Sequence, residues 1–178
     1  MLNVLKPHIL EISCDKKGTH SMQCLIEMIN MPEEEEELKQ GIKDQIVDLA
    51  FDANGTHVLQ KVLLCMKEEN IDFIFDPVIE NFIDLSMDQN GLCVIKKIIS
   101  KVEGHERRIR IGKILSENVV SLVQSPYGNY AVQQALDVST HELIFVIELA
   151  SRILLATFLE AGASPDAALC PKVLLKCD

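Results

Sequence analysis

A glycine recurs along this chain at almost constant spacing, and that spacing restricts the fold more than any other feature of the sequence. Successive glycines of the series are 37, 36 and 37 residues apart: Gly18, Gly55, Gly91 and Gly128. Three residues before each glycine stands a side chain that can cap the start of a helix: Asp15, Asp52, Asp88 and Ser125. Such a period is typical of an array of stacked repeats.

The segments on either side of each glycine have the periodicity of helices. Similar apolar segments precede the four turns, at residues 9–12, 46–49, 82–85 and 119–122. Each unit is therefore predicted to be an amphipathic helix, a short turn and a second amphipathic helix. Since neither helix can bury its apolar face alone, the units must stack, and the sequence predicts an all-α solenoid.

The predicted domain organisation is a single repeat domain over residues 1–178. Its units are expected at about 1–31, 38–68, 71–103 and 106–138, followed by a degenerate fifth unit or C-terminal cap at 139–178. Apolar residues make up 48% of the chain and aromatic residues only 4%. This composition suits a core of aliphatic side chains between helices better than a β-sandwich.

Charge and cysteine usage narrow the class of protein further. The net charge of −10 disfavours binding to the phosphates of a nucleic acid. Part of this charge comes from five consecutive glutamates, Glu33–Glu37. They are predicted to form a solvated loop or a helix start. The six cysteines lack CxxC spacing, so we interpret them as core residues of a reduced, cytoplasmic protein. No apolar stretch is long enough for a membrane span, and the start of the chain does not look like a secretory signal.

The helix that follows each glycine has one polar and one apolar face. At about 100° per residue, the second unit places Thr56, His57 and Gln60 on the open side and Val58, Leu59, Val62 and Leu63 on the packed side. The same projection exposes Asn129, Tyr130 and Gln133 in the fourth unit. In the third unit it exposes Leu92, Cys93, Lys96 and Lys97. The array is thus predicted to present one set of side chains per unit along one surface.

The chemistry of these sets suits the bases of a nucleic acid. A hydroxyl or amide and a glutamine four residues later offer donors and acceptors toward the edge of a flat base. An imidazole or phenol beside them offers a face for stacking, which contributes about 1–3 kcal/mol per base. A single set of this kind would be an ordinary solvated helix face, so the prediction depends on its recurrence in register.

Three segments resemble the RNA-binding helices of Pumilio-family (PUF) repeats: Gly18–Gln23, Gly55–Lys61 and Tyr127–Gln133. The resemblance covers residues 1 to about 150 and implies a right-handed α-solenoid that binds single-stranded RNA, one base per repeat. It implies base-edge contacts from Thr19 with Gln23, Thr56 with Gln60, and Asn129 with Gln133. It implies stacking by His20, His57 and Tyr130.

In this family a small residue with glutamine recognises adenine, asparagine with glutamine recognises uracil, and the RNA runs antiparallel to the protein. The resemblance therefore implies a 5′-U-N-A-A-3′ element, with the undefined base opposite the third unit. Leu92 cannot hydrogen-bond a base edge there, and Lys96 replaces the glutamine. Lys96 and Lys97 are candidates for phosphate contacts, or they are simply solvated lysines.

The C-terminal part departs from the pattern. Residues 141–155 are predicted to be the first helices of a fifth unit. The segment Pro171–Cys177 is similar to a recognition helix of the family, but Pro171 and Leu175 occupy its two base-edge positions. With three competent sets where the family has eight repeats, the chain is expected to be a fragment of a longer array or a shortened member that binds weakly.

The resemblance implies recognition of messenger RNA 3′ untranslated regions in post-transcriptional and translational regulation. The alternative is a degenerate solenoid that serves as a protein-interaction scaffold with little RNA affinity. We expect a monomer with regulatory proteins on its convex face, no membrane partner, no cofactor and no metal. No enzyme activity is expected, because the five histidines include no pair at metal-ligand spacing and no nucleophile has an evident base.

Overall fold

The computed structural model describes residues 5–138, and within them every regular element is a helix. The α-helices are α2 (Ile9–Cys14), α3 (Gly18–Met28), α4 (Pro32–Ile42), α5 (Ile46–Phe51), α6 (Gly55–Cys65), α7 (Asp72–Glu80), α8 (Phe82–Met87), α9 (Gly91–Lys101), α10 (His105–Gln124) and α11 (Gly128–Val138). Single 3₁₀ turns lie at Lys6–His8, Lys43–Gln45 and Glu68–Asn70. The predicted fifth unit, including the helix expected at 141–155, lies outside the described residues. Between residues 5 and 138 no helix is both long and apolar enough to cross a membrane.

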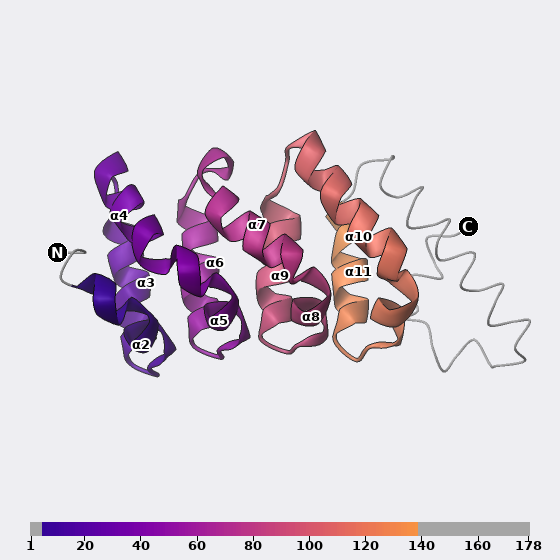
Figure 1. Ribbon diagram of the computed structural model, residues 1–178, viewed down its shortest axis with the longest axis horizontal. Helices are drawn as coiled ribbons and strands as arrows, with labels where there is room; N and C mark the ends of the chain where they lie inside the picture. Colours follow the sequence, from indigo (N-terminus) through magenta and orange to yellow (C-terminus); the bar gives the residue numbers. More distant parts are fainter. Residues whose placement is uncertain (1–4, 139–178) are drawn as a thin grey trace, which may run out of the picture.

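Four units follow one another along the long axis of the molecule (Figure 1). The helices that begin at the recurring glycines, α3, α6, α9 and α11, each pack against the next and form one row, which we call the glycine-helix row. On the other side, α4 packs on α2, α7 on α5, and α10 on α8, so each unit covers the short helix of the unit before it. This nearest-neighbour stacking confirms the predicted α-solenoid.

The prediction of two helices per unit is wrong for the second and third units, which have three. In the third unit α7 stops at Glu80 and α8 starts at Phe82. At the junction the side-chain amide of Asn81 donates a hydrogen bond to the carbonyl of Pro77, at 2.9 Å. The equivalent Asn118 makes the same bond in the fourth unit, at 2.9 Å, so the bond alone does not break the helix. The third unit also has Pro77 inside α7, which lacks a backbone N–H. In the fourth unit α10 runs through the equivalent position without a break.

The turn before each glycine helix has the predicted cap. In the second unit, Oδ1 of Asp52 accepts hydrogen bonds from the backbone N–H groups of Asn54 (2.8 Å) and Gly55 (2.7 Å). Equivalent bonds recur at Asp15, Asp88 and Ser125. At Asp15, the N–H groups of Gly18 and Lys17 hold the pKa of the carboxyl below its ordinary value.

The glycine of the turn is required by a close backbone approach. A Cβ atom at Gly55 would lie 2.8 Å from the carbonyl oxygen of Leu49, and one at Gly91 would lie 2.6 Å from that of Leu85. Both distances are below van der Waals contact with backbone that cannot move aside. The recurring glycine therefore lets each short helix pack directly against the start of the helix that follows.

The core is aliphatic, as the composition predicts. The four apolar positions projected toward the inside of α6 are all fully buried: Val58, Leu59, Val62 and Leu63. Burying a side chain of this size contributes about 1.5–3 kcal/mol. Phe75 and Phe82 are the largest of the fully buried side chains. One continuous cluster of these residues joins the four units.

The acidic run forms a helix start, one of its two predicted forms. Pro32 occupies the first turn of α4, and Glu33, Glu34 and Glu35 follow it there. Proline fits this position because its missing N–H needs no partner. The glutamates face the positive end of the helix dipole, which favours negative charge.

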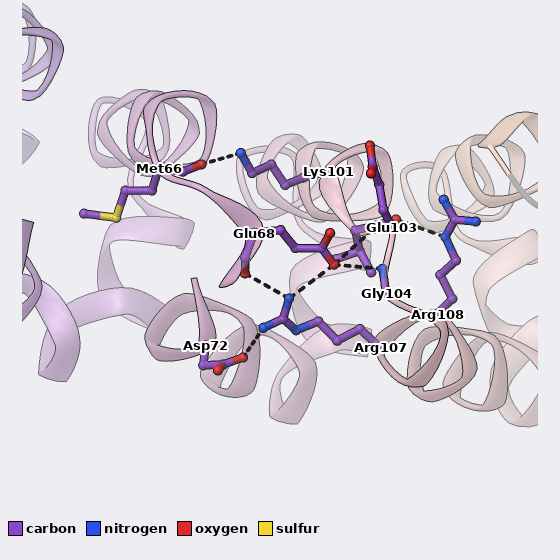
Figure 2. A network of polar contacts seen from close by, with 9 residues as sticks. Met66, Glu68, Asp72, Lys101, Glu103, Gly104, Arg107 and Arg108 are labelled. Atoms are coloured by element: carbon purple, nitrogen blue, oxygen red, sulfur yellow. Dashed lines mark hydrogen bonds and ion pairs between the residues drawn. The ribbon is translucent and has the colours of Figure 1, made fainter. Parts of the chain in front are cut away.

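Arg107 joins the third unit to the fourth (Figure 2). Its guanidinium donates to the carboxylate of Glu68 at 3.2 Å, to the Glu68 carbonyl at 2.9 Å, and to the carboxylate of Asp72 at 2.5 Å. The same Glu68 oxygen accepts the backbone N–H groups of Glu103 and Gly104. Although partial burial raises the pKa of Glu68, these hydrogen bonds outweigh it and lower that pKa.

The interpretation of the cysteines as core residues is wrong for three of the four in the described range. Cys24, Cys65 and Cys93 are exposed, and Cys14 is partly buried. All four are free thiols. Burial, together with the negative charge and hydrogen bond of Asp52, raises the pKa of the Cys14 thiol to about 11.

Replacing Arg107 is expected to weaken the contact between the third and fourth units. Its side chain is only 19% exposed, so Arg107→Ala should lower the free energy of unfolding by about 1–3 kcal/mol. Arg107→Lys should recover only part of this, because an ammonium lacks the planar fork. Urea denaturation measures both. Lys113→Ala, which removes only an exposed contact with Glu117, is the control, and an equal loss of stability in it would contradict the prediction.

The cysteines are expected to differ in reactivity. At pH 8 a thiol with a pKa of about 11 is almost entirely protonated, and the thiolate is the reactive form. Alkylation of the folded protein, followed by mass spectrometry of the peptides, should therefore modify Cys14 well after Cys24, Cys65 and Cys93. Labelling in denaturant is the control and should remove the difference. Modification of Cys14 as fast as Cys93 in the folded protein would be inconsistent with this assignment.

Candidate nucleic-acid interface

The predicted stacking residues lie at equivalent positions of neighbouring helices. His20 on α3, His57 on α6 and Tyr130 on α11 each stand two residues after the glycine and are exposed. Cys93 occupies that position on α9 and is also exposed. Tyr130 is 48% exposed despite its size. The structure therefore brings these side chains into one line along the glycine-helix row.

The glutamines lie almost one helical turn further along the same helices and are held by their predicted partners. Nε2 of Gln133 donates to Oδ1 of Asn129 at 2.9 Å. Nε2 of Gln23 donates to Oγ1 of Thr19 at 3.3 Å, and Nε2 of Gln60 to Oγ1 of Thr56 at 3.4 Å. The predicted pairs are thus assembled in the free protein, which reduces the conformational entropy lost when a ligand binds.

Asn129 is also anchored to the turn that precedes it. Its Nδ2 donates to the carbonyls of Ser125 (2.9 Å) and Pro126 (3.1 Å). Together with the bond from Gln133, these contacts fix the plane of the side-chain amide. The fourth unit therefore presents an ordered pair of amides beside an exposed phenol.

The predicted exposure of the residue directly after the glycine is wrong in three units. Thr19 is 2% exposed, Thr56 3% and Leu92 8%. Each lies where one glycine helix packs on the next. A helix that packs against a neighbour therefore buries more of its surface than the single apolar face predicted from an ideal projection. The hydroxyl of Thr19 donates to the carbonyl of Asn54 at 3.0 Å, and that of Thr56 to the carbonyl of Asn90 at 3.3 Å.

In the third unit Lys96 takes the position of the glutamine, and Lys97 follows it. Lys96 is exposed and Lys97 half-buried, and within residues 5–138 neither takes part in an ion pair. At the previous interface, by contrast, Lys61 pairs with Glu27 at 2.5 Å. Leu64 occupies the position on α6 that Glu27 has on α3. Sequence reasoning missed this difference, although comparison of the repeats position by position contains it.

The charge of the glycine-helix row differs from that of the whole chain. Its helices carry one glutamate on α3, one lysine on α6, three lysines on α9 and one aspartate on α11, a net charge of +2. The chain as a whole has −10. Much of the acid therefore lies elsewhere, including the five glutamates of α4. Among the described residues, no group of His, Cys, Asp and Glu side chains is arranged to hold a metal ion.

Comparison with known proteins identifies one repeat around each of the four recurring glycines. The model of the Pumilio-family RNA binding repeat matches residues 8–36, 45–79, 81–111 and 118–147. Putative pumilio homolog 8 of Arabidopsis thaliana is 35% identical over 129 residues, which are 72% of this chain and 25% of that protein. Pumilio homolog 12 of the same plant is 32% identical over 143 residues, 80% of this chain and 24% of that protein. The chain thus spans about a quarter of the length of these relatives.

Solved structures agree. The Puf4 RNA-binding domain, bound to the HO endonuclease RNA 3′ UTR recognition sequence, superposes with a TM-score of 0.75 at 28% identity, covering 90% of this chain and 59% of that one. The RNA-binding domain of yeast Puf5p, bound to SMX2 RNA, gives a TM-score of 0.77 at 27% identity and covers 88% and 45%. Repeat spacing, helix order and the line of exposed side chains lead to the same assignment: the chain belongs to the Pumilio (PUF) family.

Proposed function

We propose that the glycine-helix row binds single-stranded RNA, one base per unit. The observation that carries the proposal is the line of exposed His20, His57 and Tyr130 side chains beside Gln23, Gln60 and Gln133. Packing does not require aromatic and imidazole rings on an open surface. The RNA-bound state of the similar Puf4 and Puf5p domains supports the proposal.

We further propose that the element is 5′-U-N-A-A-3′. Asn129 and Gln133 would contact the uracil, Gln60 and Gln23 the two adenines, and the three exposed rings would stack on these bases. With three such contacts, affinity should be modest, because association costs oppose their sum. We also propose that the chain acts as a monomer in cytoplasmic control of messenger RNA through 3′ untranslated regions, with regulatory proteins on its convex face.

In the third unit, Lys96 and Lys97 would contact phosphate and not a base. Leu92 is buried there and Cys93 is a poor stacking surface. The missing carboxylate opposite Lys97, where Leu64 stands, leaves this cation available. Phosphate contacts of this kind add affinity without sequence information.

The alternative function is a protein-interaction scaffold with little RNA affinity. The observation that favours it is the acidic character of the outer helices α4 and α7, above all the exposed glutamates Glu33, Glu34 and Glu36 at the start of α4. Such a surface would repel RNA that approached from that side. Equal binding of matched and scrambled RNA at physiological salt would favour this alternative.

Binding of labelled RNA tests the proposed element directly. The full chain should prefer an oligonucleotide with 5′-U-N-A-A-3′ over a scrambled one at the same salt concentration. Gln133→Ala should reduce the preference for uracil at the first position by about 5- to 150-fold, the equivalent of about 1–3 kcal/mol. Tyr130→Ala should weaken the binding of the matched RNA, because it removes a stacking surface that accepts any base. Gln124→Ala removes an exposed glutamine at the end of α10 and should change neither quantity. An unchanged uracil preference in Gln133→Ala, together with unchanged affinity in Tyr130→Ala, would exclude the predicted contacts.

The salt dependence of binding tests the two lysines. Lys96→Gln with Lys97→Gln should lower the slope of log K against log salt by about 0.7 for each phosphate that these lysines neutralise. The double variant Lys43→Gln with Lys113→Gln makes the same charge change on exposed residues outside the row and should leave the slope nearly unchanged. If the two double variants have the same slope, the lysines of α9 do not contact phosphate.

A further inference from the structure

Two buried threonines form the centre of a hydrogen-bond chain that links each glycine helix to the next unit. In the first unit the chain runs from Nε2 of Gln23 to Oγ1 of Thr19 (3.3 Å), and from that hydroxyl to the carbonyl of Asn54 (3.0 Å). In the second unit it runs from Gln60 to Thr56 (3.4 Å) and on to the carbonyl of Asn90 (3.3 Å). The two chains use equivalent residues, but in the second unit Nε2 of Gln60 also donates to the backbone carbonyl of Thr56, at 3.2 Å.

A hydroxyl has one proton, so the direction of each chain is fixed. The backbone carbonyl of Asn54 can only accept, and the Thr19 hydroxyl must therefore donate to it. Toward Gln23 the threonine oxygen can then only accept, which selects the NH₂ end of the side-chain amide. The glutamine carbonyl oxygen and its second N–H remain available on the open side.

The carbonyl that receives the threonine proton is itself held by the preceding unit. The side-chain amide of Asn54 donates to the carbonyl of Cys14 at 2.8 Å, and that of Asn90 to the carbonyl of Phe51 at 2.8 Å. Each turn is thus tied to the unit before it by a bond in each direction. The position of the acceptor depends on how the two units stack.

We propose that Thr19 and Thr56 are positioning residues that orient Gln23 and Gln60 through the turn of the following unit, and that they do not contact the base. The inference rests on the proposed RNA binding and specifies it further. In these two units the resemblance implies a base contact by two residues. We infer instead that the glutamine alone contacts the base, with its amide held in one of its two orientations.

The third unit supplies the counterexample within the same chain. Leu92 occupies the position of the threonines and is equally buried. In the next turn Tyr127 replaces the asparagine, and its hydroxyl lies 3.4 Å from Oε1 of Gln89. The residue to be oriented, Lys96, has no amide. The third unit thus lacks the glutamine, the threonine hydroxyl and the asparagine of the next turn together. Leu92 serves there for packing between units.

A fixed amide discriminates between bases by the order of donor and acceptor. On the Watson–Crick edge adenine presents the N6 donor beside the N1 acceptor, whereas guanine presents the O6 acceptor beside the N1 donor. An amide free to flip matches both orders, and an amide held by threonine matches one. Loss of the hydroxyl should therefore reduce the discrimination between purines more than the binding itself.

The orientation can be tested first without RNA. The first unit gives the cleaner test, because Nε2 of Gln23 donates to the Thr19 hydroxyl, whereas Gln60 also donates to a backbone carbonyl that a side-chain substitution does not remove. In the free full chain, the side-chain amide resonances of Gln23, assigned by their disappearance in Gln23→Ala, should be well dispersed. Thr19→Val keeps the shape but removes the hydroxyl, and should move these resonances toward values of a mobile amide, while Thr19→Ser should preserve them. Unchanged Gln23 resonances in a folded Thr19→Val variant would overturn the inference, whatever the outcome with RNA.

The RNA measurement uses 5′-U-N-A-A-3′ oligonucleotides with adenine or guanine at the fourth position, opposite the first unit. The wild type and Thr19→Ser should prefer adenine by about fivefold or more, and Thr19→Val by less than about twofold. In the Gln23→Ala background, Thr19→Val should have no further effect on this preference. A further effect there would mean that Thr19 contacts the base directly, which overturns the positioning role. A wild type that does not distinguish matched from scrambled RNA rejects the proposed function, while the Gln23 resonances still decide the orientation.

Discussion

The carboxylate of Asp52 accepts hydrogen bonds from the N–H groups of Asn54 and Gly55, and most of the unit depends on the helix start that these bonds fix. Because Gly55 has no side chain, its backbone approaches the carbonyl of Leu49, and α5 packs directly against α6. The exposed rings and the glutamines proposed to meet RNA follow the glycine at fixed intervals of two and five positions. The turn therefore sets the register of recognition as well as that of the fold.

What could be predicted from the sequence is what depends on local chemistry. The cap, the glycine and the buried face of α6 follow from side chains within a few residues of one another, and the structure has them as expected. The burial of Thr56 and Leu92 depends on how closely a neighbouring helix packs, which an ideal projection of one helix does not contain. The break between α7 and α8 does not follow from Asn81 alone, because the equivalent Asn118 makes the same side-chain bond in the unbroken α10.

The charge of the molecule is divided between its two sides in a way that the net value conceals. The glutamates of α4 lie at the positive end of a helix dipole, where they stabilise the helix that carries them. Arg107 and Arg110 meet the acidic side chains Asp72 and Asp76 of α7 and lie over the ring of Phe75, so these opposite charges hold consecutive units together. The acidic side chains of α4 and α7 therefore stabilise the stacked units without placing negative charge on the glycine-helix row.

The third unit shows how a solenoid changes one binding position without changing the fold. Leu92, Lys96 and, in the next turn, Tyr127 all differ from their counterparts in the second unit, yet α9 packs between α6 and α11 in the same way. In a solenoid each unit contacts only the unit before it and the unit after it. The packing around a substituted residue therefore has to change only at these two interfaces. At the interface with α11, the buried leucine takes the packing position of a threonine, and Tyr127 in the next turn packs against the core. The unit can therefore carry Leu92 and Lys96 in place of a threonine and a glutamine while the register of the units on either side is preserved.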